Sequence, residues 1–223
     1  MNHSMRKRSP GKHRKKQPAR GRFIVLDGPD GAGKTTQAQL LRERLEERGL
    51  RVKLLREPGG TAAGEAIRKL LLEQKEIGLS ALAEAFLFQA ARAQLVAEVI
   101  QPSLARGEWV LCDRFTLSTL VYQGLAGGVA PKVVEQLSAA ATDGVKPDRY
   151  LVLWVPPSVG VDRRKHREND RMESKGARFI RAVANGFKKE AERGAARYRL
   201  IDGTGEAAAV RERIWKQVEP LTR

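Results

Sequence analysis

Residues 23–37 combine amino-acid types in an order that suits phosphate binding. Residues 23–27 suit a short buried strand, which runs directly into the pattern Gly28-x-x-x-x-Gly33-Lys34-Thr35 at the start of an expected helix. Glycines allow backbone turns that aim successive N–H groups at phosphate oxygens, and the helix N-terminus adds partial positive charge. The alternative is an ordinary glycine-rich turn between a strand and a helix. Such turns are common, but a strand, the residues GKT and a helix in this order are not. The pattern predicts a phosphate-binding loop formed by Gly28, Pro29, Asp30, Gly31, Ala32, Gly33, Lys34, Thr35 and Thr36.

Two side chains at the end of this loop add charge and a metal ligand to the backbone cradle. Lys34 brings a full positive charge to the β- and γ-phosphates of a nucleoside triphosphate. The hydroxyl of Thr35 is an oxygen ligand that suits Mg²⁺. The loop therefore predicts a nucleotide with β- and γ-phosphates as a ligand and Mg²⁺ as a cofactor.

A second group of charged residues, 163–171 (RRKHRENDR), forms the densest charge cluster outside the N-terminal region. A solvated helix face is the usual meaning of such a run. An enzyme with a phosphate-binding loop, however, needs cations that close over the transferring phosphoryl group. The sequence by itself does not place this segment on the loop.

The elements that must position these residues follow a regular alternation. Apolar runs predict strands at 23–27, 52–55, 109–112, 150–155 and 198–201. Helices are expected from the loop to about residue 48, at 62–72, from the N-cap Ser80 toward 100, and at 206–218, with others after Phe115, Pro131, Ser158 and Gly176. Pro102 is expected to kink or end the third of these helices. The alternation predicts an α/β fold, a three-layer parallel five-stranded sheet flanked by helices.

Composition limits the class of protein further. The 223 residues carry a formal net charge of +16, and residues 1–21 are rich in Arg and Lys, with no acid and few apolar side chains. This basic tail is expected to be disordered, with at most weak contact to polyanions. No apolar run approaches the ~20 residues that cross a bilayer, so no membrane contact is expected. The single cysteine, Cys112, excludes an intramolecular disulfide and suits a reducing compartment such as the cytoplasm.

Three further motifs narrow the chemistry: residues 56–61 read REPGGT, residues 86–92 read FLFQAAR, and residues 113–124 read DRFTLSTLVYQG. Together with the phosphate-binding loop, they resemble the thymidylate kinase (dTMP kinase) family, in the bacterial type whose lid carries catalytic arginines. The resemblance covers residues 22 to about 215. It implies a P-loop nucleotide kinase domain over 22–223 with a short lid at about 160–176.

The resemblance also assigns roles in substrate binding. Phe88 would stack on the thymine ring, and Arg92, one helical turn later on the same face, would donate to thymine O4. Thr119 and Gln123 match positions that contact the base, whereas Arg68 and Arg114 match arginines that hold the substrate phosphate. The implied dTMP site comprises Glu57, Arg68, Phe88, Arg92, Arg114, Thr119, Tyr122 and Gln123.

The catalytic set follows from the same resemblance. Asp113 resembles an acid that acts with Thr35 on Mg²⁺, partly through water. The lid is one residue shorter than the usual spacing, which leaves open which arginine reaches the γ-phosphate. The implied catalytic residues are Lys34, Asp30, Arg114, Arg163, Arg167 and Arg171.

The reaction implied is ATP + dTMP → ADP + dTDP. Another nucleoside monophosphate kinase or a deoxynucleoside kinase is the nearest alternative, and a nucleic-acid-binding P-loop ATPase, motivated by the basic tail, is a more distant one. Family resemblance also implies a homodimer. An apolar helix face with Leu82, Phe86 and Leu87 suits such a contact, but core packing explains it equally well.

Overall fold

The computed structural model describes residues 20–165, 170–194 and 196–222. Within them the chain forms a five-stranded, wholly parallel sheet with strand order β2-β3-β1-β4-β5. The predicted tail lies outside the described residues apart from its last two positions, and Arg167 lies outside them as well. The strands are β1 (Phe23–Asp27), β2 (Val52–Arg56), β3 (Trp109–Asp113), β4 (Arg149–Trp154) and β5 (Tyr198–Asp202).

Helices cover both faces of the sheet and connect successive strands. The α-helices are α1 (Lys34–Glu46), α2 (Ala62–Leu72), α3 (Ala81–Leu95), α4 (Gln101–Ala105), α5 (Thr116–Thr119), α6 (Pro131–Thr142), α7 (Pro157–Asp162), α8 (Ala177–Arg193) and α9 (Ala207–Val218). Shorter helical turns are η1 (Val96–Ile100), η2 (Leu120–Leu125), η3 (Glu173–Lys175) and η4 (Glu219–Leu221). In the described part of the chain, no helix is both long and apolar enough to cross a membrane.

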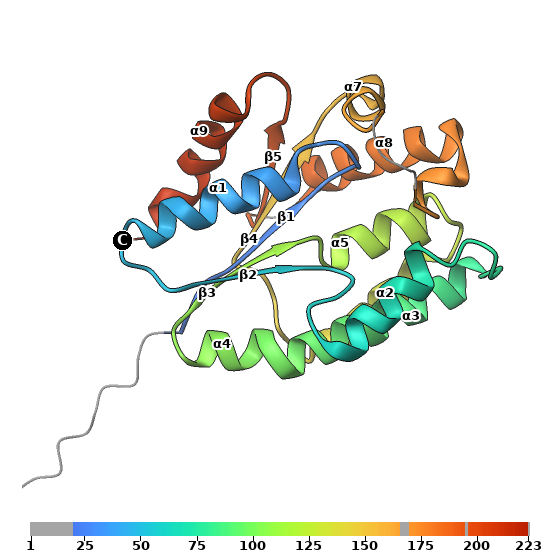
Figure 1. The fold of residues 1–223 in the computed structure, drawn as a ribbon, viewed down its shortest axis with the longest axis horizontal. Helices are drawn as coiled ribbons and strands as arrows, with labels where there is room; N and C mark the ends of the chain where they lie inside the picture. Colours follow the sequence, from blue (N-terminus) through green and yellow to red (C-terminus); the bar gives the residue numbers. More distant parts are fainter. Residues whose placement is uncertain (1–19, 166–169, 195, 223) are drawn as a thin grey trace, which may run out of the picture.

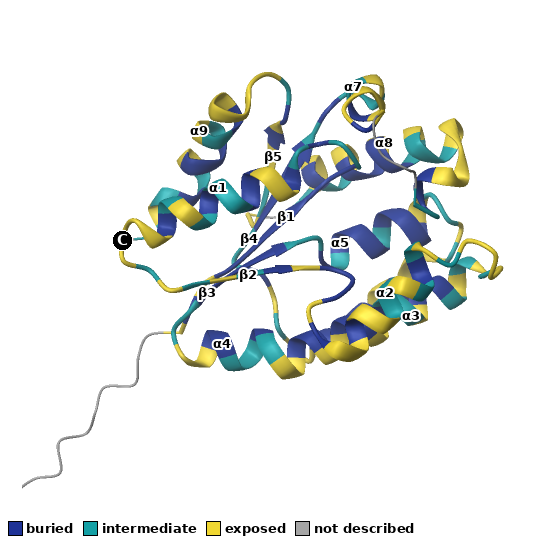
Figure 2. Cartoon of the chain, viewed as in Figure 1, coloured by how far each residue is buried: buried dark blue, intermediate teal, exposed yellow. Residues whose placement is uncertain are grey.

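Alternation along the central strands builds two hydrophobic layers. In β1, Ile24 and Leu26 pack with residues of α1 and α9, whereas Phe23 and Val25 pack with residues of α3, η1, η2 and α8 on the opposite face. Figure 1 shows α1 and α9 together on one side of the sheet and α3, α4 and α5 on the other. The central strands are buried, and exposed positions gather on the outer faces of the helices (Figure 2). The predicted three-layer α/β architecture is confirmed.

The third predicted helix departs from α-helical geometry just before Pro102, where a kink or an end was expected. It does not end before the proline, because the backbone widens into the π turn η1 and then continues as α4 to Ala105. The N–H of Gln101 donates to the carbonyl of Val96, five residues back, so the turn before the proline is wider than an α-helical turn. The wider turn accommodates a residue that has no N–H to donate and whose ring crowds the preceding turn.

The sheet register brings the functional loops to one edge. Leu26 of β1 lies beside Asp113 of β3, and Asp113 lies beside Arg56 of β2. Because all strands are parallel, the phosphate-binding loop after β1 and the segments after β2 and β3 leave the sheet at the same carboxyl edge. The fold therefore gathers three of the sequence motifs before any side-chain contact is considered.

Candidate active site

The carboxyl edge of the sheet opens onto a cavity of about 500 Å³. Its walls come from the phosphate-binding loop, the ends of β2 and β3, helices α2 and α3, the α5–η2 segment, and residues before and after 166–169. Most of the residues that the sequence assigned to a site line this one cavity: Asp30, Gly31, Gly33, Lys34, Thr35, Thr36, Glu57, Arg68, Phe88, Arg92, Asp113, Arg114, Thr119, Tyr122, Gln123 and Arg163. Gly28, Pro29 and Ala32 complete the loop without lining the cavity, and Arg171 does not line it.

The phosphate-binding loop is held tightly against α7. Gly31 has φ +80°, and a Cβ atom there would lie 2.3 Å from the carbonyl oxygen of Gly160. Gly28, with φ +139°, is similarly close to the carbonyl of Leu153 in β4. Only glycine fits either position. The positive φ is unfavourable for a residue with a side chain, and a Cβ atom would collide with the neighbouring backbone. Backbone packing against α7 and β4 therefore fixes the curved shape of the loop.

Lys34 extends back over this loop. Its Nζ donates to the carbonyl oxygen of Pro29 at 2.8 Å, and the side chain is buried. Burial, together with the positive charge of Arg114, lowers the pKa of Lys34 from 10.5 to about 8, although Asp30 opposes this shift. The ammonium group thus lies where the negative charge of a nucleotide phosphate would stabilise it.

Thr35 and Asp113 form a second contact in the cavity. Thr35 Oγ1 donates to Asp113 Oδ2 at 2.6 Å, which joins the start of α1 to the end of β3. Both groups supply oxygen ligands of the kind Mg²⁺ prefers, and Mg²⁺ usually keeps several waters besides one or two protein ligands. No cluster of three or more His, Cys, Asp or Glu suitable for a metal occurs among the described residues. The pair therefore fits a metal ion that shares its coordination with phosphate and water.

Arg114 is the most constrained cation in the cavity. It has φ +73°, and its Nη1 donates to the carbonyl of Gly28 and to Ser118 Oγ, both at 3.0 Å. Its Nη2 pairs with Asp30, which also accepts the Tyr122 hydroxyl at 2.5 Å. Burial alone would raise the pKa of Asp30, but Arg114 and Lys34 outweigh it and lower that pKa to about 2. Asp30 thus stays ionised and fixes Arg114 beside the loop.

Asp27, which the sequence analysis did not select, lies close to Arg114 and binds Ser118 beside it. Asp27, the fully buried last residue of β1, accepts hydrogen bonds from Ser118 N (3.1 Å) and Ser118 Oγ (2.6 Å) and lies 3.8 Å from Arg114. Burial raises its pKa, and Arg114 opposes this shift. An acid that ends a buried strand was the available signal. Its role depends on α5, which sequence spacing does not place against β1.

Arg92 lies at the other end of the cavity in a hydrogen-bonded cluster. It is 1% exposed, and its Nε and Nη2 donate to Glu57 Oε2 at 2.8 and 2.5 Å. Its Nη1 donates to Gln89 Oε1 at 2.6 Å and to Thr119 Oγ1 at 3.1 Å. Phe88 also lines this end, with Gln123 in the π turn η2. A planar aromatic ring beside fixed donors and acceptors is the pattern expected for a nucleobase.

Arg68 of α2 lies beside the REPGGT segment. Its Nη1 donates to the carbonyl of Pro58 at 2.9 Å. Burial and the nearby Arg56 lower its pKa, which shows that two cations share this part of the wall. Arg56 was quoted within a motif, but no role was predicted for it. Both arginines suit a phosphate group between the base end and the phosphate-binding loop.

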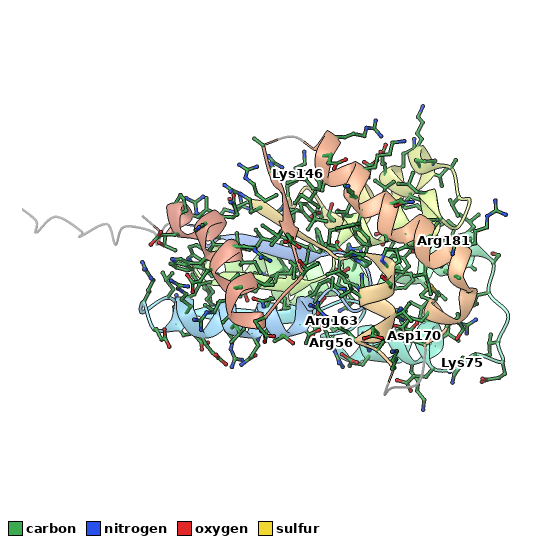
Figure 3. All side chains as sticks on the ribbon, turned by 90° about the horizontal axis from the view of Figure 1, so that it is seen from above. Arg56, Lys75, Lys146, Arg163, Asp170 and Arg181 are labelled. Carbon is green, nitrogen blue, oxygen red and sulfur yellow. The ribbon has the colours of Figure 1, made fainter. Side chains whose placement is uncertain are left out.

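The predicted lid arginines separate in the structure. Arg163 lines the cavity, and its Nη1 donates to the carbonyl of Gly203 at 3.1 Å. Arg164, which the sequence analysis did not select, also lines the cavity, is buried, and pairs with Glu173 at 3.0 Å. Figure 3 labels Arg163 near Arg56 and Asp170, two further cavity residues. The two arginines are adjacent in the sequence and differ in burial: Arg163 is exposed and Arg164 is buried. The sequence alone does not reveal this difference.

Arg171 points away from the cavity. Its Nε donates to the carbonyl of Leu71 at 3.0 Å and its Nη2 to that of Leu70 at 3.2 Å. The same guanidinium also donates to the carbonyls of Gln74 and Ile77. A cation that satisfies the last carbonyls of a helix stabilises its C-terminus. In this structure Arg171 caps α2, and it is not among the residues that line the cavity.

Fold and site together define a class. A parallel sheet whose first strand enters a P-loop, an acid at the end of the adjacent strand, and a cation-rich cavity with a separate base-binding end are the features of a P-loop nucleotide kinase.

Comparison with known proteins specifies the family. The sequence matches the thymidylate kinase family model over residues 26–214. It is 46% identical over 204 residues to the thymidylate kinase of Pelotomaculum thermopropionicum (91% of this chain, 94% of that protein), and 42% identical over 207 residues to that of Afipia carboxidovorans (91% of each). The crystal structure of thymidylate kinase from Ehrlichia chaffeensis matches with TM-score 0.73 and 34% identity, covering 89% of this chain and 98% of that one. The chain belongs to the thymidylate kinase family, which confirms the resemblance of its motifs.

Lys34 leads to a prediction about protons. Phosphates raise its pKa, so MgATP binding at pH 8.5 should take up a fraction of a proton, and affinity should fall as pH rises through about 8. Calorimetric titrations in two buffers with different ionisation enthalpies measure this uptake. Lys34→Arg, whose charge does not titrate, is the control and should abolish the uptake. Equal heats in both buffers for the unaltered protein would contradict the assignment.

The two lid arginines lead to a paired prediction. Arg171→Ala removes the cap of α2 and should lower the free energy of unfolding by about 2 kcal/mol, a fall in Tm of roughly 5 °C. Arg163 is exposed and its hydrogen bonds to carbonyls are longer (3.1 to 3.4 Å), so Arg163→Ala should lower Tm by less than Arg171→Ala. It should lower kcat on the order of 10³-fold or more, because it removes a cavity cation. Thermal melts and steady-state kinetics on both variants provide the comparison. A larger loss of kcat in Arg171→Ala than in Arg163→Ala would reverse the two roles.

Proposed function

We propose that the cavity holds ATP and dTMP end to end and transfers the γ-phosphoryl group between them, giving ADP and dTDP. Family membership supports this reaction, and the alternatives left open by the sequence, including a nucleic-acid-binding ATPase, are not favoured by the comparisons. The observation that carries the proposal is the continuity of one cavity, with Lys34 at one end, Arg114 between, and the Phe88–Arg92 base end opposite.

Charge alignment supplies the catalysis in this proposal. The nucleophile is a phosphate oxygen of dTMP that is already anionic, so no protein group has to remove a proton. The main obstacle is repulsion between two polyanions, which Lys34, Arg114 and the lid cations Arg163 and Arg164 offset. Arg68 holds the dTMP phosphate, and Asp30 keeps Arg114 in place. Mg²⁺, held by Thr35 and by Asp113 in part through water, would neutralise charge on the phosphate oxygens.

The base end supports thymine as the preferred base. Stacking on Phe88 contributes roughly 1–3 kcal/mol but accepts any base. Discrimination then depends on Arg92, which has donors only and would meet O4 of thymine favourably. Cytosine carries an amino group at that position, so the guanidinium would be left unpaired against it.

A substrate panel tests the proposed function directly. With MgATP, kcat/KM should be highest for dTMP, about 10–200-fold lower for dUMP, which lacks only the methyl group, and lower again for dCMP. ADP release with dTMP, dUMP, dCMP, dGMP and AMP gives this order. Equal rates for dUMP and dCMP would remove Arg92 from its role. Preference for another monophosphate would keep the phosphate chemistry but overturn the thymine assignment.

We also propose that the enzyme works as a homodimer. Leu82 and Phe86 of α3 are 45% and 54% exposed, so core packing in a single chain does not explain them, whereas Leu87 is half-buried. Val133 of the adjacent helix α6 is exposed as well. Exposed apolar side chains on neighbouring helices suit burial against a second copy.

The dimer proposal predicts an effect on mass. Phe86→Glu places a charge in the proposed contact and should give the mass of a single chain by light scattering after size-exclusion chromatography. Leu200→Glu, at a similarly exposed apolar residue of β5, is the control and should stay dimeric. A dimer in both variants would overturn the assignment of this face.

We place this reaction in the cytoplasm. The buried, unpaired thiol of Cys112 suits a reducing compartment, and a phosphoryl donor such as ATP is the co-substrate that the loop predicts. Retention of full activity under reducing conditions is expected, and loss of activity on reduction would contradict it.

A further inference from the structure

Glu84 is a buried acid in the first turn of α3 that does not line the cavity. It is 1% exposed, and both of its carboxylate oxygens accept from Lys175 Nζ at 2.7 Å. Lys175 ends η3, a short turn near the end of the expected lid segment. A buried carboxylate is costly unless it is paired, so Lys175 accounts for the charge of Glu84. The pair leaves the carboxylate free to accept a further hydrogen bond.

That further hydrogen bond comes from Gln123. Its Nε2 donates to Glu84 Oε2 at 3.3 Å and lies 3.7 Å from the sulfur of Met172, a weak acceptor. A carboxylate can only accept, so the nitrogen of the Gln123 amide, and not its oxygen, has to face Glu84. No described residue donates to Gln123 Oε1. The amide oxygen is therefore the atom that Gln123 offers to a ligand in the cavity.

Arg92 offers the opposite polarity at the same end of the cavity. Glu57, Gln89 and Thr119 accept four hydrogen bonds from its guanidinium. Since a guanidinium has five N–H groups, one Nη2–H is left for a ligand. The base end thus combines one donor, from Arg92, with one acceptor, from Gln123. Thymine presents the matching pair, an O4 acceptor beside an N3–H donor, whereas cytosine presents an N4 amino group beside an N3 acceptor.

We propose that Glu84 is a positioning residue for base selection: by holding the Gln123 amide with its oxygen toward the cavity, it makes the base end complementary to thymine and mismatched to cytosine. This inference rests on the proposed function. It predicts that loss of the Glu84 carboxylate lets the Gln123 amide turn over and offer its NH₂ group. The amide would then satisfy cytosine N3 and oppose thymine N3–H.

A purely structural role for Glu84, joining η3 to α3, makes a different prediction. Loosening that junction would lower turnover of every monophosphate by a similar factor. Base orientation, in contrast, changes the ratio of kcat/KM for dTMP to that for dCMP. The ratio therefore distinguishes the two roles.

The test uses the full chain with Glu84→Gln and Lys175→Met combined, so that no charge is left buried alone. The dTMP-to-dCMP ratio should fall about tenfold or more, through a higher KM for dTMP, while KM for ATP stays unchanged. Lys175→Arg keeps the charge pair and is the matched control, with an unchanged ratio. If the double variant does not fold, Glu84→Gln alone replaces the acceptor-only group at nearly constant volume.

A double-mutant cycle with Gln123→Ala locates the effect. In the Gln123→Ala background, the Glu84 change should have no further effect on the ratio. An unchanged ratio in the Gln123-containing protein, or an equal change with and without Gln123, would overturn the proposal. If the proposed function itself is wrong, the unaltered protein will not turn over dTMP. This outcome is distinct from an unchanged ratio in the variants.

Discussion

Cations packed beside one another need fixed anions to hold them, and this constraint organises the whole active site. Arg114 lowers the pKa of Lys34, and both cations lower the pKa of Asp30. Arg114 itself lies between Asp27 and Asp30. Without these acids, the two cations would repel each other in a largely buried place. With them, a curved loop and a rigid guanidinium are ready for phosphate before any ligand binds.

The parallel sheet makes that arrangement possible. Asp27 ends β1, the phosphate-binding loop follows at once, and Arg114 follows β3 as its neighbour in the sheet. The α5–η2 segment then contributes Ser118 to the phosphate side and Gln123 to the base side. The segment that follows β3 therefore reaches both halves of the cavity. This explains why residues 113–124 supply many of the residues that line it.

The fold class and the P-loop were predicted from local patterns, strand, turn and helix in a fixed order, whereas the residues of the substrate site came from the family resemblance of three motifs. Features that depend on tertiary contacts were not accessible in the same way. Pro102 was expected to kink or end a helix, and the structure adds that the helix widens into the π turn η1 before it and continues as α4. Arg164, Asp27 and Glu84 were missed, since burial and partners from distant elements give them their roles. Arg171 was grouped with the lid arginines by family resemblance, whereas its contacts are with the end of α2.

In the proposed reaction, one continuous cavity holds both nucleotides end to end around Arg114. Binding of a bisubstrate compound that joins adenosine and thymidine through a chain of phosphates tests this arrangement. We expect one compound per chain, competition with both ATP and dTMP, and a strong loss of affinity in Arg114→Lys, since a lysine lacks the planar fork that contacts two oxygens. Competition with only one of the two nucleotides, or affinity unaffected by Arg114→Lys, would contradict it.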